Sequence, residues 1–160
     1  MGTIDPASAE FTTVAELNGD VPALVLAMTI DETGTAWVSD GVGLWMMDLA
    51  TGVCVNVATQ FTDTATSTAV DGILSMATDG EGNFWAFDVN SDTLWSLDEA
   101  TGDLTAVGVF PALLGDANFA NNAMDWDPVS GFLIADVYTG GGTGSSVSYT
   151  HLTLPTICSV

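Results

Sequence analysis

The strongest constraint on the fold is an internal repeat. Three segments align without gaps: DETGTAWVSD at residues 31–40, DGEGNFWAFD at residues 79–88 and DPVSGFLIAD at residues 127–136. The first and the last Asp of each segment both recur at a spacing of 48 residues. A repeat of this length indicates a protein built from stacked supersecondary units, none of which can bury its apolar surface alone.

A second motif follows each of the first two segments. LWMMDLATGVCVNVA at residues 44–58 matches LWSLDEATGDLTAVG at residues 94–108, and the related IDPASAEFTTVAEL lies at residues 4–17. The offset in this motif is 50 residues, because DVNSDT at residues 88–93 replaces the shorter DGVG at residues 40–43. An insertion confined to a turn is expected in a folded repeat, since turns tolerate added residues and strands do not.

Each repeat is expected to form four short strands. Runs of apolar and β-branched residues alternate with Gly, Asn and Asp, which is typical of β-hairpins. The two middle strands are apolar on both faces, so each sheet is expected to lie between two others. The pattern predicts an all-β fold, namely a partial, open β-propeller of four-stranded antiparallel blades with about three blades' worth of sequence. A β-solenoid is the alternative.

The repeats divide the chain into five parts. These are the second half of a blade (residues 1–24), two whole blades (25–70 and 71–120), the first half of a further blade (121–146) and a C-terminal tail (147–160). The tail lies outside the pattern, and its opening VSYTHLTLPT resembles a translated transposon-end adapter from sequencing libraries. We therefore expect a repeat protein cut at both ends, with an artefact tail that carries His151 and Cys158. A divergent natural C-terminus is the alternative.

The charge of the chain excludes several classes of partner. It has no Lys or Arg and 21 acidic residues, which gives a formal net charge of -21. Affinity for nucleic acids and for anionic membranes depends on cationic side chains, so we expect neither as a partner. Repulsion between the acids must be relieved by salt, bound cations or spacing. A solvated acidic surface suits an extracellular or cell-surface protein, although residues 1–24 show no signal-peptide pattern.

The repeat also resembles a known group of proteins. The stretch MATDGEGNFWAFDVNSDTLWSLDEATGDLTAVG at residues 76–108 is similar to the blades of bacterial extracellular β-propellers of the NHL, YVTN and gluconolactonase-like groups. The likeness rests on D-x-x-G-x followed by two hydrophobic residues, and on a following L-aromatic-x-(I/L)-D-x-(A)-TG. It implies a secreted or surface-exposed propeller. It implies little about activity, because such blades occur in binding proteins, lyases, lactonases and structural proteins.

No set of residues in the chain amounts to an active site. His-based catalysis is excluded once His151 is assigned to the tail, and Schiff-base chemistry requires a Lys that the chain lacks. We therefore expect a non-catalytic binding or scaffold module for a protein or glycan ligand, completed by the remaining blades of its own full-length chain. The alternative is a metal-dependent gluconolactonase-like hydrolase. That resemblance implies a divalent metal held by Glu, Asn and Asp in the central channel, but it assigns none of the residues here.

One segment partly matches a calcium-binding loop. Asp88, Asn90, Asp92 and Glu99 fall at positions 1, 3, 5 and 12 of that pattern, whose oxygen ligands suit calcium. Position 6, which should be Gly, is Thr93. The repeat gives a second explanation, in which Asp88 closes a strand, the next residues form a hairpin turn and Glu99 precedes the ATG turn. The four residues are the candidate metal site, and calcium is the candidate cofactor.

The recurring Asp and Trp residues have structural explanations. Asp side chains accept hydrogen bonds from nearby backbone N–H groups in turns. Trp at repeated strand positions is expected in the core between blades, with an aromatic sugar-binding platform as the alternative. The residues are Asp31, Asp79, Asp127, Asp40, Asp88, Asp136, Asp48 and Asp98, together with Trp37, Trp45, Trp85 and Trp95. Cys54, in the strand VCVNV, is expected to be a buried small hydrophobe.

We predict that the isolated 160-residue chain is only marginally stable or prone to aggregation at low salt. The terminal sheets of an open ring expose apolar faces and unpaired edges, and the acidic residues repel one another. Thermal unfolding followed by circular dichroism at low and high NaCl measures this. A sharp two-state transition at low salt would contradict the prediction.

Overall fold

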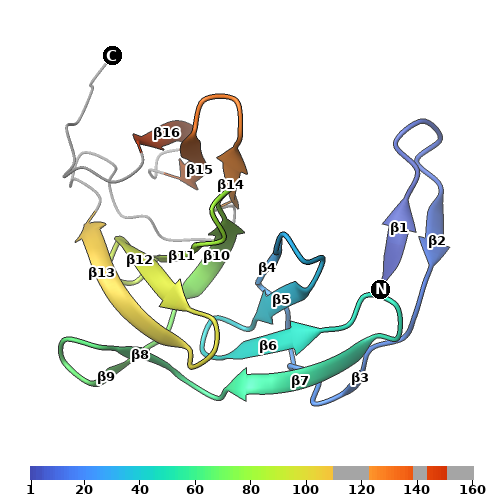
Figure 1. Cartoon of the computed structure of the whole chain (residues 1–160), viewed down its shortest axis with the longest axis horizontal. Helices are drawn as coiled ribbons and strands as arrows, with labels where there is room; N and C mark the ends of the chain where they lie inside the picture. Colours follow the sequence, from blue (N-terminus) through green and yellow to red (C-terminus); the bar gives the residue numbers. More distant parts are fainter. Residues whose placement is uncertain (110–122, 139–143, 151–160) are drawn as a thin grey trace.

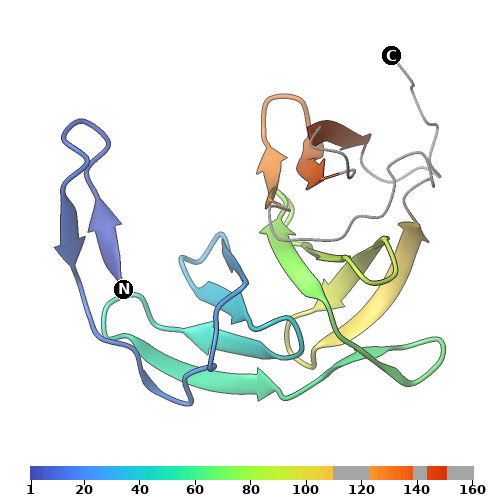
Figure 2. The same ribbon diagram turned by 180° about the vertical axis from the view of Figure 1, so that it is seen from behind.

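The computed structural model describes residues 1–109, 123–138 and 144–150, and every regular element in these ranges is a β-strand. The strands form four sheets, which Figures 1 and 2 show fanned out along an open arc. The fold is therefore an all-β partial propeller, as the sequence predicts. None of the described residues forms a helix of the length and apolarity needed to cross a membrane.

Two complete antiparallel blades occupy the middle of the arc. The first contains β4 (Ala27–Ile30), β5 (Ala36–Ser39), β6 (Leu44–Met47) and β7 (Val53–Ala58), and the second contains β10 (Ile73–Thr78), β11 (Phe84–Asp88), β12 (Thr93–Asp98) and β13 (Asp103–Val109). Their registers are equivalent: Trp37 pairs with Thr29 in the first blade, and Trp85 pairs with Ala77 in the second. The repeat in the sequence is thus a repeat in hydrogen bonding.

A short parallel strand extends the outer edge of each blade. The hairpin of β1 (Gly2–Ile4) and β2 (Phe11–Thr13) leads into β3 (Asn18–Gly19), which pairs with β7, while β8 (Phe61–Asp63) pairs with β13 at the equivalent positions. Only the second blade then adds β9 (Thr68–Val70), which pairs with β8. We call this hairpin, residues 61–70, the arm. The arm belongs to the second sheet, whereas the repeat pattern in the sequence places these residues with the blade at 25–70.

The third unit has a different register. It contains β14 (Ala123–Asp127), β15 (Phe132–Tyr138) and β16 (Gly144–Thr150). Asp127 pairs with Phe132, whereas in the second blade the equivalent partner of Phe84 is Thr78, one residue earlier in its strand. The position of a glycine explains the shift.

Gly34 and Gly82 adopt positive φ three residues after the repeat Asp, but the third unit places Gly131, with φ of 73°, four residues after Asp127. A positive φ is readily adopted only by Gly, so the turn follows the glycine and the pairing slips with it. The ungapped alignment of the third segment therefore holds for the sequence but not for the strand register. Residues 147–150 of the expected tail lie in β16, and residues 151–160 lie outside the described residues.

The hydrophobic core lies between the blades rather than within them. On β11, Phe84 and Ala86 join the cluster shared with the first blade, whereas Trp85 and Phe87 join the cluster shared with β14 and β15. Trp37 of the first blade meets Phe84 edge to face, with ring centroids 5.5 Å apart. β5 and β11 are therefore buried on both faces, as their sequence predicts, whereas β6 leaves Met46 38% exposed. Cys54 is also buried, at 2% exposure, and burial raises the pKa of its thiol.

Asp31 and Asp79 each accept hydrogen bonds from the backbone of their own turn and from a Trp side chain. Trp37 Nε1 donates to Asp31 Oδ2 at 2.9 Å, and Trp85 Nε1 donates to Asp79 Oδ2 at 3.0 Å. The other oxygen of Asp79 accepts from the backbone N–H groups of Glu81 and Asn83 at 2.8 and 2.9 Å. Burial raises the pKa of Asp79, but the hydrogen bonds from Asn83, Trp85 and Glu81 outweigh burial and lower it overall. The predicted turn role is confirmed for Asp31 and Asp79, whereas Asp136 lies within β15, paired with Ser146, and does not end its strand at a turn.

We predict that Asp79→Asn lowers the free energy of unfolding by about 1–3 kcal/mol, because an NH₂ group would face the buried N–H of Trp85 or Asn83. Asp127→Asn is the matched control. Asp127 Oδ2 accepts from the Ser130 hydroxyl, which can rotate to accept instead, and from the Ser130 N–H at 3.3 Å, where both bonds are exposed to solvent, so its cost should be smaller. Urea denaturation measures both costs, and equal costs would contradict the role of the indole.

The cost of Asp79→Asn should also depend on pH. The folded-state pKa of Asp79 lies below 3.8, so the stabilisation by its carboxylate is present above that pH. It is lost as the pH falls through the folded-state pKa. The difference between wild type and Asp79→Asn in urea denaturation should therefore shrink in strong acid, and a constant difference would count against the carboxylate.

Candidate functional site

The two complete blades differ at two places, and these are where a site is best sought. One is the segment 88–93 that connects the middle strands, which has two residues more than the equivalent segment 40–43 because β11 and β12 are each one residue longer at this end than β5 and β6; we call it the longer turn. The other is the arm, which has no counterpart in the first blade. Shared features of a repeat serve its packing, so features present in one blade alone call for another explanation.

The structure brings the two departures together. Asn90, in the longer turn, donates from Nδ2 to the backbone oxygen of Asp71 at 2.6 Å and to Asp71 Oδ1 at 3.3 Å. Asp71 directly follows the arm. The backbone N–H of Val89 also donates to the carbonyl of Gly72 at 3.1 Å. These hydrogen bonds link the longer turn to the base of the arm.

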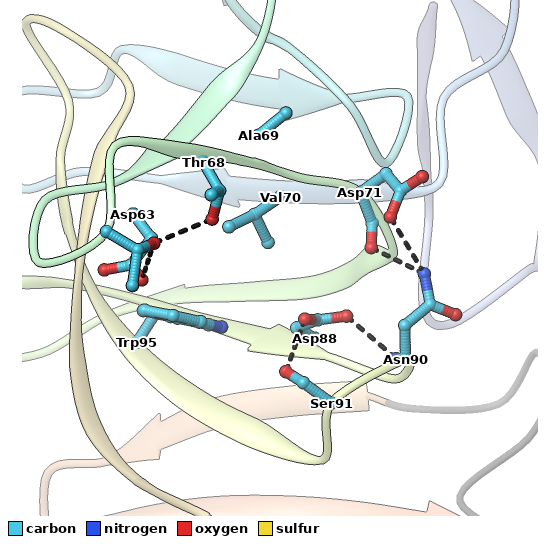
Figure 3. Close-up of a pocket in the computed structure, with 10 residues that line it drawn as sticks. Asp63, Thr68, Ala69, Val70, Asp71, Asp88, Asn90, Ser91 and Trp95 are labelled. Atoms are coloured by element: carbon cyan, nitrogen blue, oxygen red, sulfur yellow. Dashed lines mark hydrogen bonds between the residues drawn. The ribbon is translucent and has the colours of Figure 1, made fainter.

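An open pocket of about 360 Å³ lies between the arm and this turn (Figure 3). Its polar lining comes from both sides: Asp63, Thr68 and Asp71 from the arm and its base, and Asp88, Asn90 and Ser91 from the turn. Trp95, on β12, completes the lining. We call this the arm pocket. Both departures from the repeat contribute residues to its lining.

Two aspartates of the arm pocket form the same kind of turn. Asp88 Oδ1 accepts from the backbone N–H of Asn90 at 2.8 Å, and Oδ2 accepts from the hydroxyl of Ser91 at 2.5 Å. Asp63 likewise accepts from the N–H two residues later and from the hydroxyl of Thr66 three residues later. These bonds lower the pKa of Asp63, with that of Thr66 contributing most, so its carboxylate is ionised at neutral pH.

The fifth residue of these turns has a left-handed backbone. Asp92 has φ of 52° and Ser67 has φ of 57°, and Gly131 occupies the same place after Asp127. Asp is among the residues that tolerate this conformation. The spacing of Asp88, Asn90 and Asp92 thus has a backbone explanation that requires no metal.

The calcium candidates are only partly brought together. Asp88, Asn90 and Asp92 lie in or beside one turn, but Glu99 follows the six-residue strand β12 and lies at its other end. At about 3.3 Å per residue, this separates Glu99 from the turn by about 20 Å. Among the residues whose positions are described, no group of three or more His, Cys, Asp or Glu is arranged to hold a metal ion. Calcium at the turn stays a prediction.

Trp95 also lines the pocket, and its sequence position predicts a place in the core, with an aromatic sugar-binding platform as the alternative. It is 6% exposed and packs in the same cluster as Phe61 and Val70 of the arm. Its Nε1 atom is buried and has no hydrogen-bond partner. Trp45, at the equivalent position of the first blade, has no arm beside it and is only partly buried.

The fold is shared with solved β-propeller-like structures. The chain matches Myxococcus xanthus glutaminyl cyclase with a TM-score of 0.51 and 17% identity, over 72% of this chain and 53% of that one. It matches an auxiliary nutrient binding protein from Bacteroides ovatus with a TM-score of 0.52 and 16% identity, over 84% of this chain and 30% of that one. It matches the extracellular domain of a protein assigned as a one-component system from B. thetaiotaomicron with a TM-score of 0.51 and 13% identity, over 89% and 20%.

These likenesses concern the fold alone, because the identities are low and the chain spans about half or less of each structure. No protein-family model matches the chain, and no curated protein sequence does. A function for this chain is therefore inferred from the residues of the arm pocket.

We predict that Glu99→Gln leaves any calcium response of the protein unchanged, because β12 separates this carboxylate from the turn. Calcium titration followed by thermal unfolding compares wild type, Glu99→Gln and Asp88→Asn. If calcium stabilises the protein, only Asp88→Asn should weaken that effect. If Glu99→Gln lost the calcium response, Glu99 would be a calcium ligand, as the sequence pattern suggests, and this prediction would be wrong.

Proposed function

We propose that this chain is part of a secreted or surface-exposed β-propeller that binds its ligand without catalysis, and that the arm pocket is the binding site. The observation that carries the proposal is the meeting of the two departures from the repeat. An added hairpin and a lengthened turn arise at separate places in the sequence, yet they line one pocket and are joined through Asn90 and Asp71. Packing alone does not require either, since the first blade has neither.

The chemistry of the pocket supports binding rather than turnover. Its ionisable residues are carboxylates, and both oxygens of Asp63 and of Asp88 already accept hydrogen bonds within their own turns. Activation of a nucleophile by an adjacent His or Lys is not available in the arm pocket, because its lining contains neither residue. Glutaminyl cyclase shares the fold, so the fold by itself does not decide between binding and catalysis.

The similar folds of a nutrient binding protein and an extracellular domain support an extracellular setting. The net charge of -21 supports it as well, because such a charge maintains solubility and repels nucleic acids and anionic membranes. The partner is then a protein or a glycan that lacks strong negative charge.

The proposal predicts that ligand binding depends on Asn90. A thermal-shift screen of the whole chain against neutral glycans, amines, peptides and divalent cations identifies a ligand, and the variants locate it. Asn90→Ala removes the bonds to Asp71 and should weaken binding by about tenfold or more. Asn56→Ala, which alters an amide on β7 of the first blade, is the matched control and should bind normally.

Two outcomes would contradict the proposed function. One is a ligand whose affinity is the same in Asn90→Ala as in wild type, because the site would then lie elsewhere. The other is turnover of lactone or ester substrates in the presence of a divalent metal, because the protein would then be the gluconolactonase-like hydrolase of the alternative hypothesis.

A further inference from the structure

We infer that the arm pocket takes an uncharged, hydroxyl-rich ligand of the carbohydrate type, with one hydroxyl accepting from Trp95 Nε1 and neighbouring hydroxyls donating to the carboxylates of Asp63 and Asp88. The inference rests on the proposed function, since it specifies the ligand of the same site. The observation behind it is that the buried donor Trp95 Nε1 has no hydrogen-bond partner, while the pocket around it is lined by carboxylates that accept hydrogen bonds.

The donor is the indole N–H of Trp95. An indole nitrogen can only donate, and a buried donor without an acceptor costs about 1–3 kcal/mol. The repeat shows the usual solution to this cost, since the indoles of Trp37 and Trp85 both donate to the Asp of the preceding turn. Trp95 lies on a different strand, where Asp31 and Asp79 have no counterpart within its reach, and its Nε1 has no partner.

The arm creates this situation. Its residues Phe61 and Val70 pack with Trp95 in one core cluster, while Trp45 in the blade without an arm remains partly exposed and can bond to solvent. Figure 3 shows the indole nitrogen of Trp95 at the end of the side chain that is directed toward Asp88. Because this nitrogen is buried, its contact with a ligand requires the arm to move slightly.

The acceptors are the carboxylates on the opposite walls. Asp63 and Asp88 each accept two bonds in their turns, and a carboxylate offers about four acceptor sites, so each can still accept from a ligand. Asp71, at the base of the arm, accepts one bond from Asn90 through its side chain. A ligand that complements the pocket therefore accepts one hydrogen bond, from Trp95, and donates several to the carboxylates.

Few chemical groups meet both demands. An anion would accept from Trp95 but is repelled by the carboxylates, and the chain has no Lys or Arg to offset this. Calcium and ammonium groups suit carboxylates but cannot accept from an N–H. A hydroxyl both donates and accepts, and a sugar presents several hydroxyls on a rigid ring. A water molecule also does both and is the competitor that an experiment must exclude.

The test observes the indole directly. In the ¹⁵N-labelled whole chain, the five Trp residues give separate indole N–H resonances, and Trp95→Phe identifies that of Trp95 by its disappearance. The probes are neutral methyl glycosides and disaccharides of glucose, galactose, mannose and N-acetylglucosamine, compared with methylammonium chloride and calcium chloride. We expect at least one neutral sugar, and neither cation, to shift the Trp95 resonance in a saturable manner.

Substitutions test whether the sugar binds in the arm pocket or elsewhere on the surface. Trp95→Phe keeps an aromatic ring but removes the donor, and should weaken binding of that sugar by about tenfold, as should Asp88→Asn. Trp45→Phe, the same change at the equivalent position of the other blade, should leave the dissociation constant unchanged. If Asp88→Asn fails to fold, as judged by circular dichroism, Asp71→Asn at the exposed base of the arm takes its place.

Three results would overturn the inference. They are a Trp95 resonance that responds to methylammonium or calcium but to no sugar, a resonance that responds to none of the probes, and sugar binding that persists unchanged in Trp95→Phe. In the first case the arm pocket still binds a ligand and the proposed function stands. A ligand that binds normally to Asn90→Ala removes the proposed function itself.

Discussion

The structure depends on one constraint: each sheet must bury both of its faces against neighbouring sheets. The second blade shows this most clearly, because Phe84 and Ala86 on β11 face one neighbour while Trp85 and Phe87 face the other. Full burial of a large apolar side chain contributes about 1.5–3 kcal/mol. Such contacts carry the association of the blades, since a chain without Lys or Arg cannot form salt bridges with those residues.

The acidic residues are accommodated by turns rather than by opposite charges. Asp48, Asp63 and Asp127 each accept from backbone N–H groups or hydroxyls within the next three residues, and these bonds lower the pKa of each carboxyl. Each such Asp therefore shapes a hairpin while its charge is stabilised locally. This explains how 21 acids are compatible with a regular β fold, and why a cluster of Asp residues in this chain is weak evidence for a metal.

The two complete blades act as controls for one another. Where they agree, as in the bonds of Trp37 to Asp31 and of Trp85 to Asp79, the shared feature serves the fold. Where they differ, as in the arm and the turn at Asn90, the second blade gains a pocket and a buried indole without a partner. Trp45 and Trp95 occupy equivalent positions in the repeat, yet only Trp95 is covered by an arm. The candidate site follows from that difference.

The sequence by itself determined the repeat, the strands within it and the role of its aspartates, because these depend on local periodicity and on turn chemistry. It also placed Trp37 and Trp85 in the core between blades. Only the tertiary structure decided that residues 61–70 join the following sheet and that Trp95 Nε1 lacks a partner. These features depend on contacts between segments far apart in the chain, and a lone sequence does not specify such contacts. The calcium pattern shows the same limit, because a spacing along the chain cannot reveal that β12 holds Glu99 away from the turn.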